Sequence, residues 1–172
     1  MKKIVCTLML AFACLASASA QKLQFHKEKT DNGTVYTYQT EDGEDYCSVY
    51  MVKKDPDKFV NGLQRIVKDG KIGFINKDGI IVIVPQYDVA GQFTGKYSLV
   101  NKGAHNVATD PQAEPDMQGG QWGVIDKKGK VIMPCGYNKV WDESKKTYIY
   151  HNGTKGFEYT NKGKLIQTTQ KK

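Results

Sequence analysis

Arginine is almost absent from this chain: Arg65 is the only one, and the other basic residues are lysines spread along the sequence. Proteins that bind nucleic acids usually concentrate basic residues in one patch or along one element. Here lysines such as Lys127 and Lys162 fall in predicted turns, where they are ordinary solvated side chains. We therefore expect no nucleic-acid partner.

Histidine is scarce as well. The three histidines, His26, His105 and His151, are far apart in the sequence, and no nucleophile elbow, phosphate-binding loop or zinc-protease motif is present. We expect that the protein is not an enzyme and that it holds no cofactor.

Only two of the four cysteines, Cys47 and Cys135, lie outside the first 20 residues. Without matching histidines they do not form a zinc site. In an oxidising compartment an even pair favours a disulfide, which would stabilise the fold by roughly 4 kcal/mol. The alternative is two separate thiols, because the bond requires a short separation of the two Cα atoms. The sequence leaves both open.

No hydrophobic run is long enough to cross a membrane as a helix, which needs about 20 residues. The longest, residues 4–15, follows two lysines and precedes a small-residue cleavage site at residues 18–20. This pattern is typical of a bacterial export signal over residues 1–20. Lipidation at Cys14 is the less favoured alternative. We expect a periplasmic or secreted protein that begins at Gln21, with a net charge of +5 from 23 basic and 18 acidic residues.

What the chain does contain is a repeated hairpin pattern. Residues 121–134 consist of an apolar arm, a polar turn from Asp126 to Gly129, and a second apolar arm that ends in proline. The aspartate can accept hydrogen bonds from the turn backbone, and glycine adopts positive φ without strain. Similar patterns begin at Lys71 and Thr154.

The spacing of glycines gives the period of the pattern. Gly123 and Gly156 are 33 residues apart, whereas Gly73 and Gly123 are 50 apart, which is 33 plus an insertion of 17 at residues 104–120. A second series has the same offsets: Gly70, Gly103 and Gly153. A period between 20 and 50 residues indicates stacked supersecondary units. We predict an all-β array of antiparallel β-hairpins.

The segment from Trp122 to Pro134, followed by Tyr137-Asn138-Lys139-Val140, resembles the WG repeat of bacterial proteins. Residues 71–103 resemble a second copy, although Ile72 stands where Trp122 does. The resemblance covers roughly residues 59–166, and it implies an all-β repeat scaffold without catalytic residues. The residues expected to define the repeats are Gly73, Gly79, Pro85, Trp122, Gly123, Gly129, Pro134, Gly156 and Gly163.

The chain divides into three parts on these observations. Residues 1–20 are the export signal, and residues 21–58, which do not keep the period, are expected to form a β-hairpin cap at the end of the array. A separate small binding module is the alternative for this region. Residues 59–172 hold the array, with a half-repeat at 59–70, a repeat at 71–103, the insertion at 104–120, a repeat at 121–153 and a partial repeat at 154–166.

Three expectations concern packing. The run Ile80–Val84 is apolar at every position, which predicts a strand buried on both faces at the centre of the core. Trp122 and Val124 share one face of a strand, so Trp122 is expected to pack in the core, with Gly123 leaving room beside its ring.

The insertion is expected to be a loop without secondary structure that the array does not need for stacking. Its acids could hold calcium, but their order lacks the glycine of an EF-hand loop, so we favour a plain surface loop. These acids are Asp110, Glu114 and Asp116.

Two functions fit these features. The first is an exported, non-catalytic scaffold that mediates interactions with proteins or the cell envelope. The alternative is a carbohydrate-binding module whose exposed aromatic rings stack on sugars, although aromatic residues also favour strands. Exposure of Trp141 separates the two, because a buried ring favours the plain scaffold. An enzyme inhibitor is a third possibility without a motif. The candidate ligand-facing aromatic residues are Tyr137, Trp141, Tyr148 and Tyr150.

Overall fold

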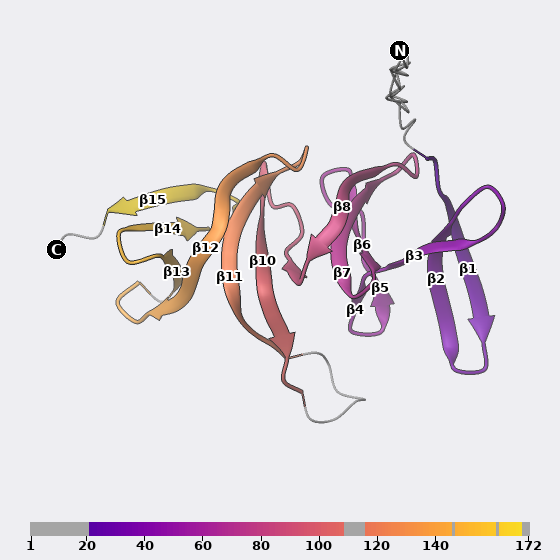
Figure 1. Cartoon of the computed structure of the whole chain (residues 1–172), viewed down its shortest axis with the longest axis horizontal. Coiled ribbons are helices and arrows are strands. Elements are labelled where there is room, and N and C mark those ends of the chain that lie inside the picture. The colour runs from indigo at the N-terminus through magenta and orange to yellow at the C-terminus, as the bar shows by residue number, and fades with distance from the viewer. Residues whose placement is uncertain (1–20, 109–115, 146, 161, 170–172) are drawn as a thin grey trace, which may run out of the picture.

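A computed structural model describes residues 21–108, 116–145, 147–160 and 162–169. The predicted export signal with Cys14 and the acids Asp110 and Glu114 fall outside these residues. The described residues form 15 β-strands joined by turns (Figure 1), which confirms the all-β prediction. In this part of the chain there is no helix of the length and apolarity that a membrane span requires.

The strands form two antiparallel sheets in which nearly every strand pairs with its neighbours in the sequence. The six-stranded sheet contains, in spatial order, β1 (Gln24–Thr30), β2 (Gly33–Gln39), β3 (Asp45–Val49), β6 (Leu63–Lys68), β7 (Lys71–Asn76) and β8 (Ile81–Tyr87). Between β3 and β6 a two-stranded ribbon consists of β4 (Met51–Val52) and β5 (Asp55–Pro56).

The seven-stranded sheet continues the array. The array as a whole begins with β1 of the first sheet and ends with β15 of the second (Figure 1). It contains β9 (Val89–Ala90), β10 (Tyr97–Asn106), β11 (Met117–Asp126), β12 (Val131–Asp142), β13 (Thr147–His151), β14 (Lys155–Tyr159) and β15 (Leu165–Thr169). The N-terminal strands share a sheet with the first repeat through the β3–β6 pairing.

The two repeats pair their hairpin arms in the same register. In the first, Ile72 lies opposite Tyr87 and Phe74 opposite Ile83; in the second, the residues 50 positions later repeat these pairs. Both hairpins have register shifts at the same two steps, which are β-bulges in the second arm. The sequence period therefore reflects one local geometry used twice.

The bulges explain why glycine follows Ile72 in the first repeat and Trp122 in the second. A Cβ atom at Gly123 would lie 2.7 Å from the Met133 carbonyl oxygen and 2.8 Å from the Cys135 nitrogen. A Cβ at Gly73 would lie 2.5 Å from the Ile83 carbonyl oxygen. The expectation that Gly123 leaves room for the Trp122 ring is thus wrong: the neighbour is the backbone of the second arm.

The hairpin turns have the predicted geometry. Gly129 has φ of 81°, and its N–H donates to the Asp126 carbonyl oxygen at 2.9 Å. The Asp126 carboxylate accepts the N–H groups of Lys128 and Lys130, each at 2.9 Å. Gly79 and Gly163 close the other two turns, with φ of 78° and 70°.

Each of these turns also contacts another part of the array. A Cβ atom added at Gly129 would lie 3.3 Å from Cγ1 of Ile83 in β8. An added Cβ at Gly79 would overlap the carbonyl group of Leu23, and one at Gly163 that of Thr94. The turns therefore join units that are distant in the sequence.

Gly129→Ala is expected to lower the free energy of unfolding by about 1 kcal/mol or more, because alanine is strained at positive φ. Gly153→Ala is the matched control, with φ of 91° and open space around the position. Chemical denaturation of both variants measures the effect. If Gly129→Ala loses more unfolding free energy than Gly153→Ala, the extra loss comes from the contact with Ile83. If Gly129→Ala is as stable as the unmodified protein, the turn assignment is refuted.

The main apolar core lies between the two sheets, where burial of apolar surface drives the association. The Phe74 and Phe93 rings meet there edge to face, with centroids 4.8 Å apart. The members of this core are Leu63, Ile72, Phe74, Ile83 and Tyr87 from the first sheet and Ala90, Phe93, Val100 and Ile125 from the second sheet and the segment after β9.

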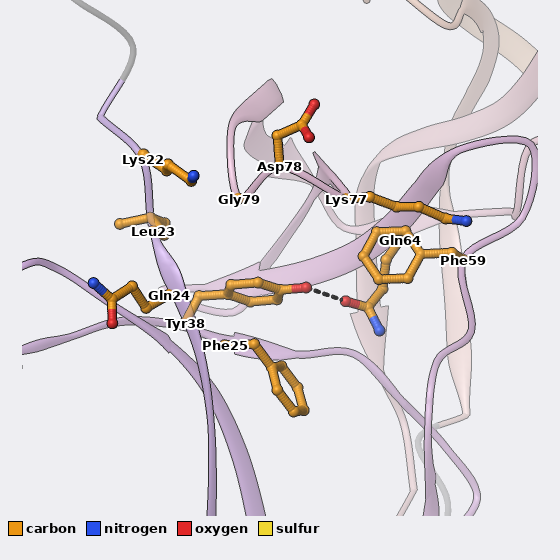
Figure 2. A pocket seen from close by; sticks show the side chains of 10 residues that line it. All are labelled: Lys22, Leu23, Gln24, Phe25, Tyr38, Phe59, Gln64, Lys77, Asp78 and Gly79. Carbon is orange, nitrogen blue, oxygen red and sulfur yellow. Dashed lines mark hydrogen bonds between the residues drawn. The ribbon is translucent and has the colours of Figure 1, made fainter.

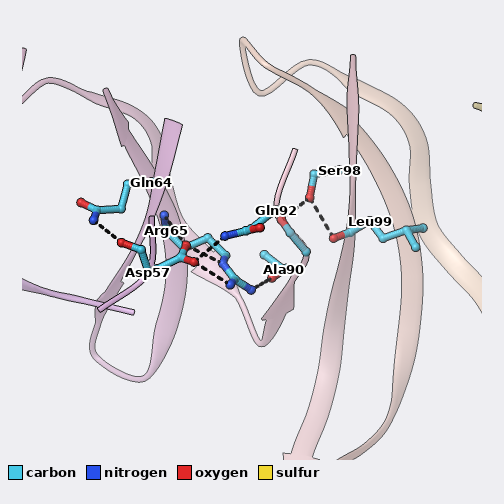
Figure 3. A network of polar contacts seen from close by, with 8 residues as sticks. Asp57, Gln64, Arg65, Ala90, Gln92, Ser98 and Leu99 are labelled. Atoms are coloured by element: carbon cyan, nitrogen blue, oxygen red, sulfur yellow. Dashed lines mark hydrogen bonds and ion pairs between the residues drawn. The ribbon is translucent and has the colours of Figure 1, made fainter. Parts of the chain in front are cut away.

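A buried ion pair also joins the sheets (Figure 3). The carboxylate of Asp57 accepts hydrogen bonds from Arg65 Nε at 2.8 Å and from Gln92 Nε2 at 2.6 Å. Arg65 also donates to the carbonyl oxygen of Ala90 in β9, at 3.0 Å. The single arginine of the chain thus has a structural role.

The prediction for the run Ile80–Val84 is wrong. Most of it belongs to β8, which is the edge strand of the six-stranded sheet. Within the run only Ile83 is buried, and Val84 is 62% exposed. An edge strand is paired on one side only, and the bulge opposite β7 contains Val84.

The interpretation of residues 104–120 as a loop without secondary structure is also wrong. The ends of the insertion lengthen β10 and β11, with Ala104 opposite Gly119 and Asn106 opposite Met117. Residues 109–115 lie outside the described ranges. Asn101, which is fully buried, donates its side-chain N–H to the Gly119 carbonyl oxygen at 3.2 Å. The insertion is therefore bonded to the core of the array.

Candidate functional site

The two cysteines are separate free thiols. Cys47 is buried in a core of the six-stranded sheet, whereas Cys135 lies on β12 against the core between the sheets. Burial raises the pKa of Cys47 to about 11 and also raises that of Cys135. The structure therefore has two separate thiols in place of a disulfide between Cys47 and Cys135. Across the described ranges, no three His, Cys, Asp or Glu side chains gather to hold a metal ion.

The four candidate aromatic residues separate into a buried pair and an exposed pair. Tyr137 and Tyr150 are 5% and 4% exposed, and both pack on Phe157, with ring centroids 5.0 and 4.7 Å away. Burial raises the pKa of Tyr150 to about 12. The hypothesis that these two tyrosines face a ligand is therefore wrong, because they form the core of the last strands.

Trp141 and Tyr148 are 44% and 45% exposed. They lie opposite each other on β12 and β13, with ring centroids 5.0 Å apart at an interplanar angle of 70°. The indole N–H of Trp141 donates to Glu143 Oε1 at 2.9 Å, which fixes the ring orientation. This pair is the strongest candidate for contact with a ligand.

Lys139 completes this surface. Its Nζ lies 3.9 Å from the ring centroid of Tyr148 and 5.3 Å from that of Trp122. Burial lowers the pKa of Lys139. Trp122 is half-buried and meets the buried Tyr150 edge to face, at 5.9 Å. We call the group Trp122, Lys139, Trp141 and Tyr148 the aromatic surface.

A one-residue difference between the repeats creates the aromatic surface. In the first repeat Val100 pairs with Ala90. Tyr150, 50 positions after Val100, would pair with Val140 at the same spacing, but it pairs with Lys139. Because side chains alternate between the faces of a strand, this shift moves Lys139, and the tryptophan two residues later, to the face of Tyr150.

Lys139 is the residue that the sequence-based prediction missed. Its signal was the alternation of Tyr137, Lys139 and Trp141 along one strand, opposite the alternating Tyr148 and Tyr150. Two strands with aromatic residues at every second position place them on one face.

A second candidate is a hollow of about 460 Å³ at the N-terminal end of the six-stranded sheet (Figure 2). Its buried polar groups already have partners: Tyr38 Oη donates to Gln64 Oε1 at 2.6 Å, and Gln64 Nε2 donates to the Asp57 carbonyl oxygen at 2.5 Å. The chemistry of this hollow is therefore less specific than that of the aromatic surface. It is lined by Lys22, Leu23, Gln24, Phe25, Tyr38, Phe59, Gln64, Lys77, Asp78 and Gly79.

A family model described as a WG containing repeat matches residues 72–104 and 122–150. The chain thus contains two WG repeats. The matched ranges begin with the two hairpins that share their bulges, and the second range includes all four residues of the aromatic surface. No curated protein and no solved structure gives a match. The two WG repeats share one hairpin geometry, and the aromatic surface belongs to the second of them.

Proposed function

We propose that this WG repeat protein is an exported, non-catalytic binding module that recognises a glycan of the cell envelope. The observation that carries the proposal is the exposure of Trp141 beside Tyr148. Large aromatic rings are usually buried, and an exposed cluster of them marks an interaction site. A sugar ring presents an apolar C–H face, which fits against such rings.

The rigidity of the surface favours binding. Glu143 holds the Trp141 indole through its N–H, and the ammonium group of Lys139 rests on the Tyr148 ring. Rings that are already oriented lose little conformational freedom when a ligand arrives, which raises affinity. The export part of the proposal rests on residues 1–20, and the non-catalytic part on the scattered histidines and the missing nucleophile motifs.

Trp141→Ala is expected to weaken binding to the recognised polysaccharide by about tenfold or more, because truncating a central aromatic contact costs about 2 kcal/mol. Affinity electrophoresis in gels that contain neutral or acidic polysaccharides identifies the ligand, and calorimetry with oligosaccharides measures the affinity. The variant is expected to keep its thermal midpoint because the ring is exposed.

Phe25→Ala is the matched control, since Phe25 is 54% exposed on β1 at the other end of the array. We expect it to bind as the unmodified protein does. If Trp141→Ala retains full affinity, the site does not lie on the aromatic surface. If the unmodified protein binds none of the polysaccharides, the glycan proposal fails and a protein partner takes its place.

A further inference from the structure

The ammonium group of Lys139 is positioned by aromatic rings and not by a carboxylate. Among the described residues the ion pairs are Arg65–Asp57, Lys71–Asp88 and Lys145–Glu158. Lys139 takes part in none of them. A cation over the faces of tryptophan and tyrosine is attracted by the ring electrons, and this attraction uses none of its three N–H donors.

Lys27 and Lys68 also lie over tyrosine rings, 5.5 and 3.4 Å from the centroids, but each faces a single ring. Lys102 differs because it has a polar partner. Lys102 lies over the Tyr87 ring at 5.3 Å, but it also donates to Gln86 Oε1 at 3.0 Å. Lys139 is exposed, so an incoming group can reach its donors. Partial desolvation lowers the pKa of Lys139, and an anion beside its ammonium group would favour the charged form.

The positions of Lys139 and Trp141 fit one acidic sugar residue. The two residues are two positions apart on β12, which places them on the same face and about 7 Å apart along the strand. The carboxylate of Glu143 lies at the indole edge of Trp141, where it accepts the N–H. A ring stacked on Trp141 and Tyr148 could therefore direct a carboxylate toward Lys139.

We propose that the aromatic surface selects acidic sugars over neutral ones, and that Lys139 binds the carboxylate of a uronic acid whose ring stacks on Trp141 and Tyr148. This inference rests on the proposed function and specifies its ligand class. Lys139 is the specificity-determining residue, and the exposed rings supply affinity for acidic and neutral sugars alike. The net positive charge of the chain attracts a polyanion over longer distances.

The test compares an oligosaccharide of galacturonic acid with its methyl ester, which has the same rings without the charge. The unmodified protein is expected to bind the acid at least tenfold more tightly than the ester, in keeping with a charge-assisted hydrogen bond. Lys139→Gln is expected to lose this preference while its affinity for the ester stays unchanged. Lys139→Arg is expected to retain the preference, because arginine also stacks on rings and binds carboxylates.

Lys102→Gln is the matched control, because it removes a ring-bound lysine elsewhere and changes the net charge equally. It is expected to keep the preference for the acid. Equal affinity for acid and ester in the unmodified protein would overturn the inference and leave glycan binding intact. A preference that survives in Lys139→Gln, or binding to neither oligosaccharide, would overturn it as well. Absence of binding to every polysaccharide in the gels would instead refute the proposed function.

Discussion

Asp57→Asn is expected to lower the free energy of unfolding by about 3 kcal/mol, because it leaves the guanidinium of Arg65 beside a buried amide without a counter-charge. The side chains of Asp57 and Arg65 are only 1% and 12% exposed. The change also disturbs the contacts of Gln92, and with them the junction of the two sheets. Urea denaturation of the variant and the unmodified protein measures the difference.

The effect is expected to depend on pH. Burial by itself would raise the pKa of Asp57, but the hydrogen bonds and charge of Arg65 and the hydrogen bond from Gln92 outweigh it and lower the pKa. A carboxyl with a lowered folded-state pKa stabilises the fold above its unfolded pKa of about 3.9, and the contribution is lost as the pH falls through the folded-state value. The difference between the two proteins should therefore shrink in acid.

Lys71→Gln provides the control for this prediction. Lys71 pairs with Asp88, and the side chain of Lys71 is 46% exposed whereas that of Asp88 is 12% exposed. Because the lysine reaches solvent, removal of its charge is expected to cost about 1 kcal/mol, less than the loss in Asp57→Asn. Similar losses in Asp57→Asn and Lys71→Gln would show that the junction of the sheets does not depend on the buried ion pair.

The second large effect is expected at the glycine of the WG repeat. Gly123→Ala should cost about 3 kcal/mol, because its Cβ would meet backbone atoms of Met133 and Cys135 at less than 3 Å. These atoms belong to the bulge of β12, which cannot retreat without loss of its pairing with β11. Thermal and chemical denaturation measure the loss.

Gly136→Ala is the matched control in the same bulge. The nearest atom to an added Cβ there is the Pro134 carbonyl oxygen, 4.0 Å away. We expect this substitution to be tolerated. If both substitutions have the same small effect, close approach of the backbone does not explain the glycine at position 123.

The sequence predicts the repeated unit well because its signals are local. The turn from Asp126 to Gly129 depends on residues within a few positions of one another, and so does the alternation of Trp122 and Val124. The family resemblance is confirmed for the same reason: the hairpin motif lies within one stretch of chain.

The predictions that proved wrong concern how strands are arranged relative to one another. The composition of Ile80–Val84 does not reveal that β8 is the edge strand of its sheet. The two ends of the insertion pair with each other, but they are not apolar, so no hydrophobic pattern in the sequence indicates this pairing. Likewise, Tyr137 and Trp141 look equivalent in the sequence, and only the packing of the last strands buries one and exposes the other.

The order in which the strands pair has a consequence for how the chain acquires its structure. Apart from the β4–β5 ribbon between β3 and β6, each strand in the two sheets pairs with strands next to it in sequence. Such local pairing favours rapid folding. A chain that emerges with its N-terminus first can therefore complete each hairpin as soon as its second arm appears. The contact of Gly163 with Thr94 and the hydrogen bond from Tyr159 Oη to the Tyr97 carbonyl oxygen, 2.6 Å long, would then form among the last.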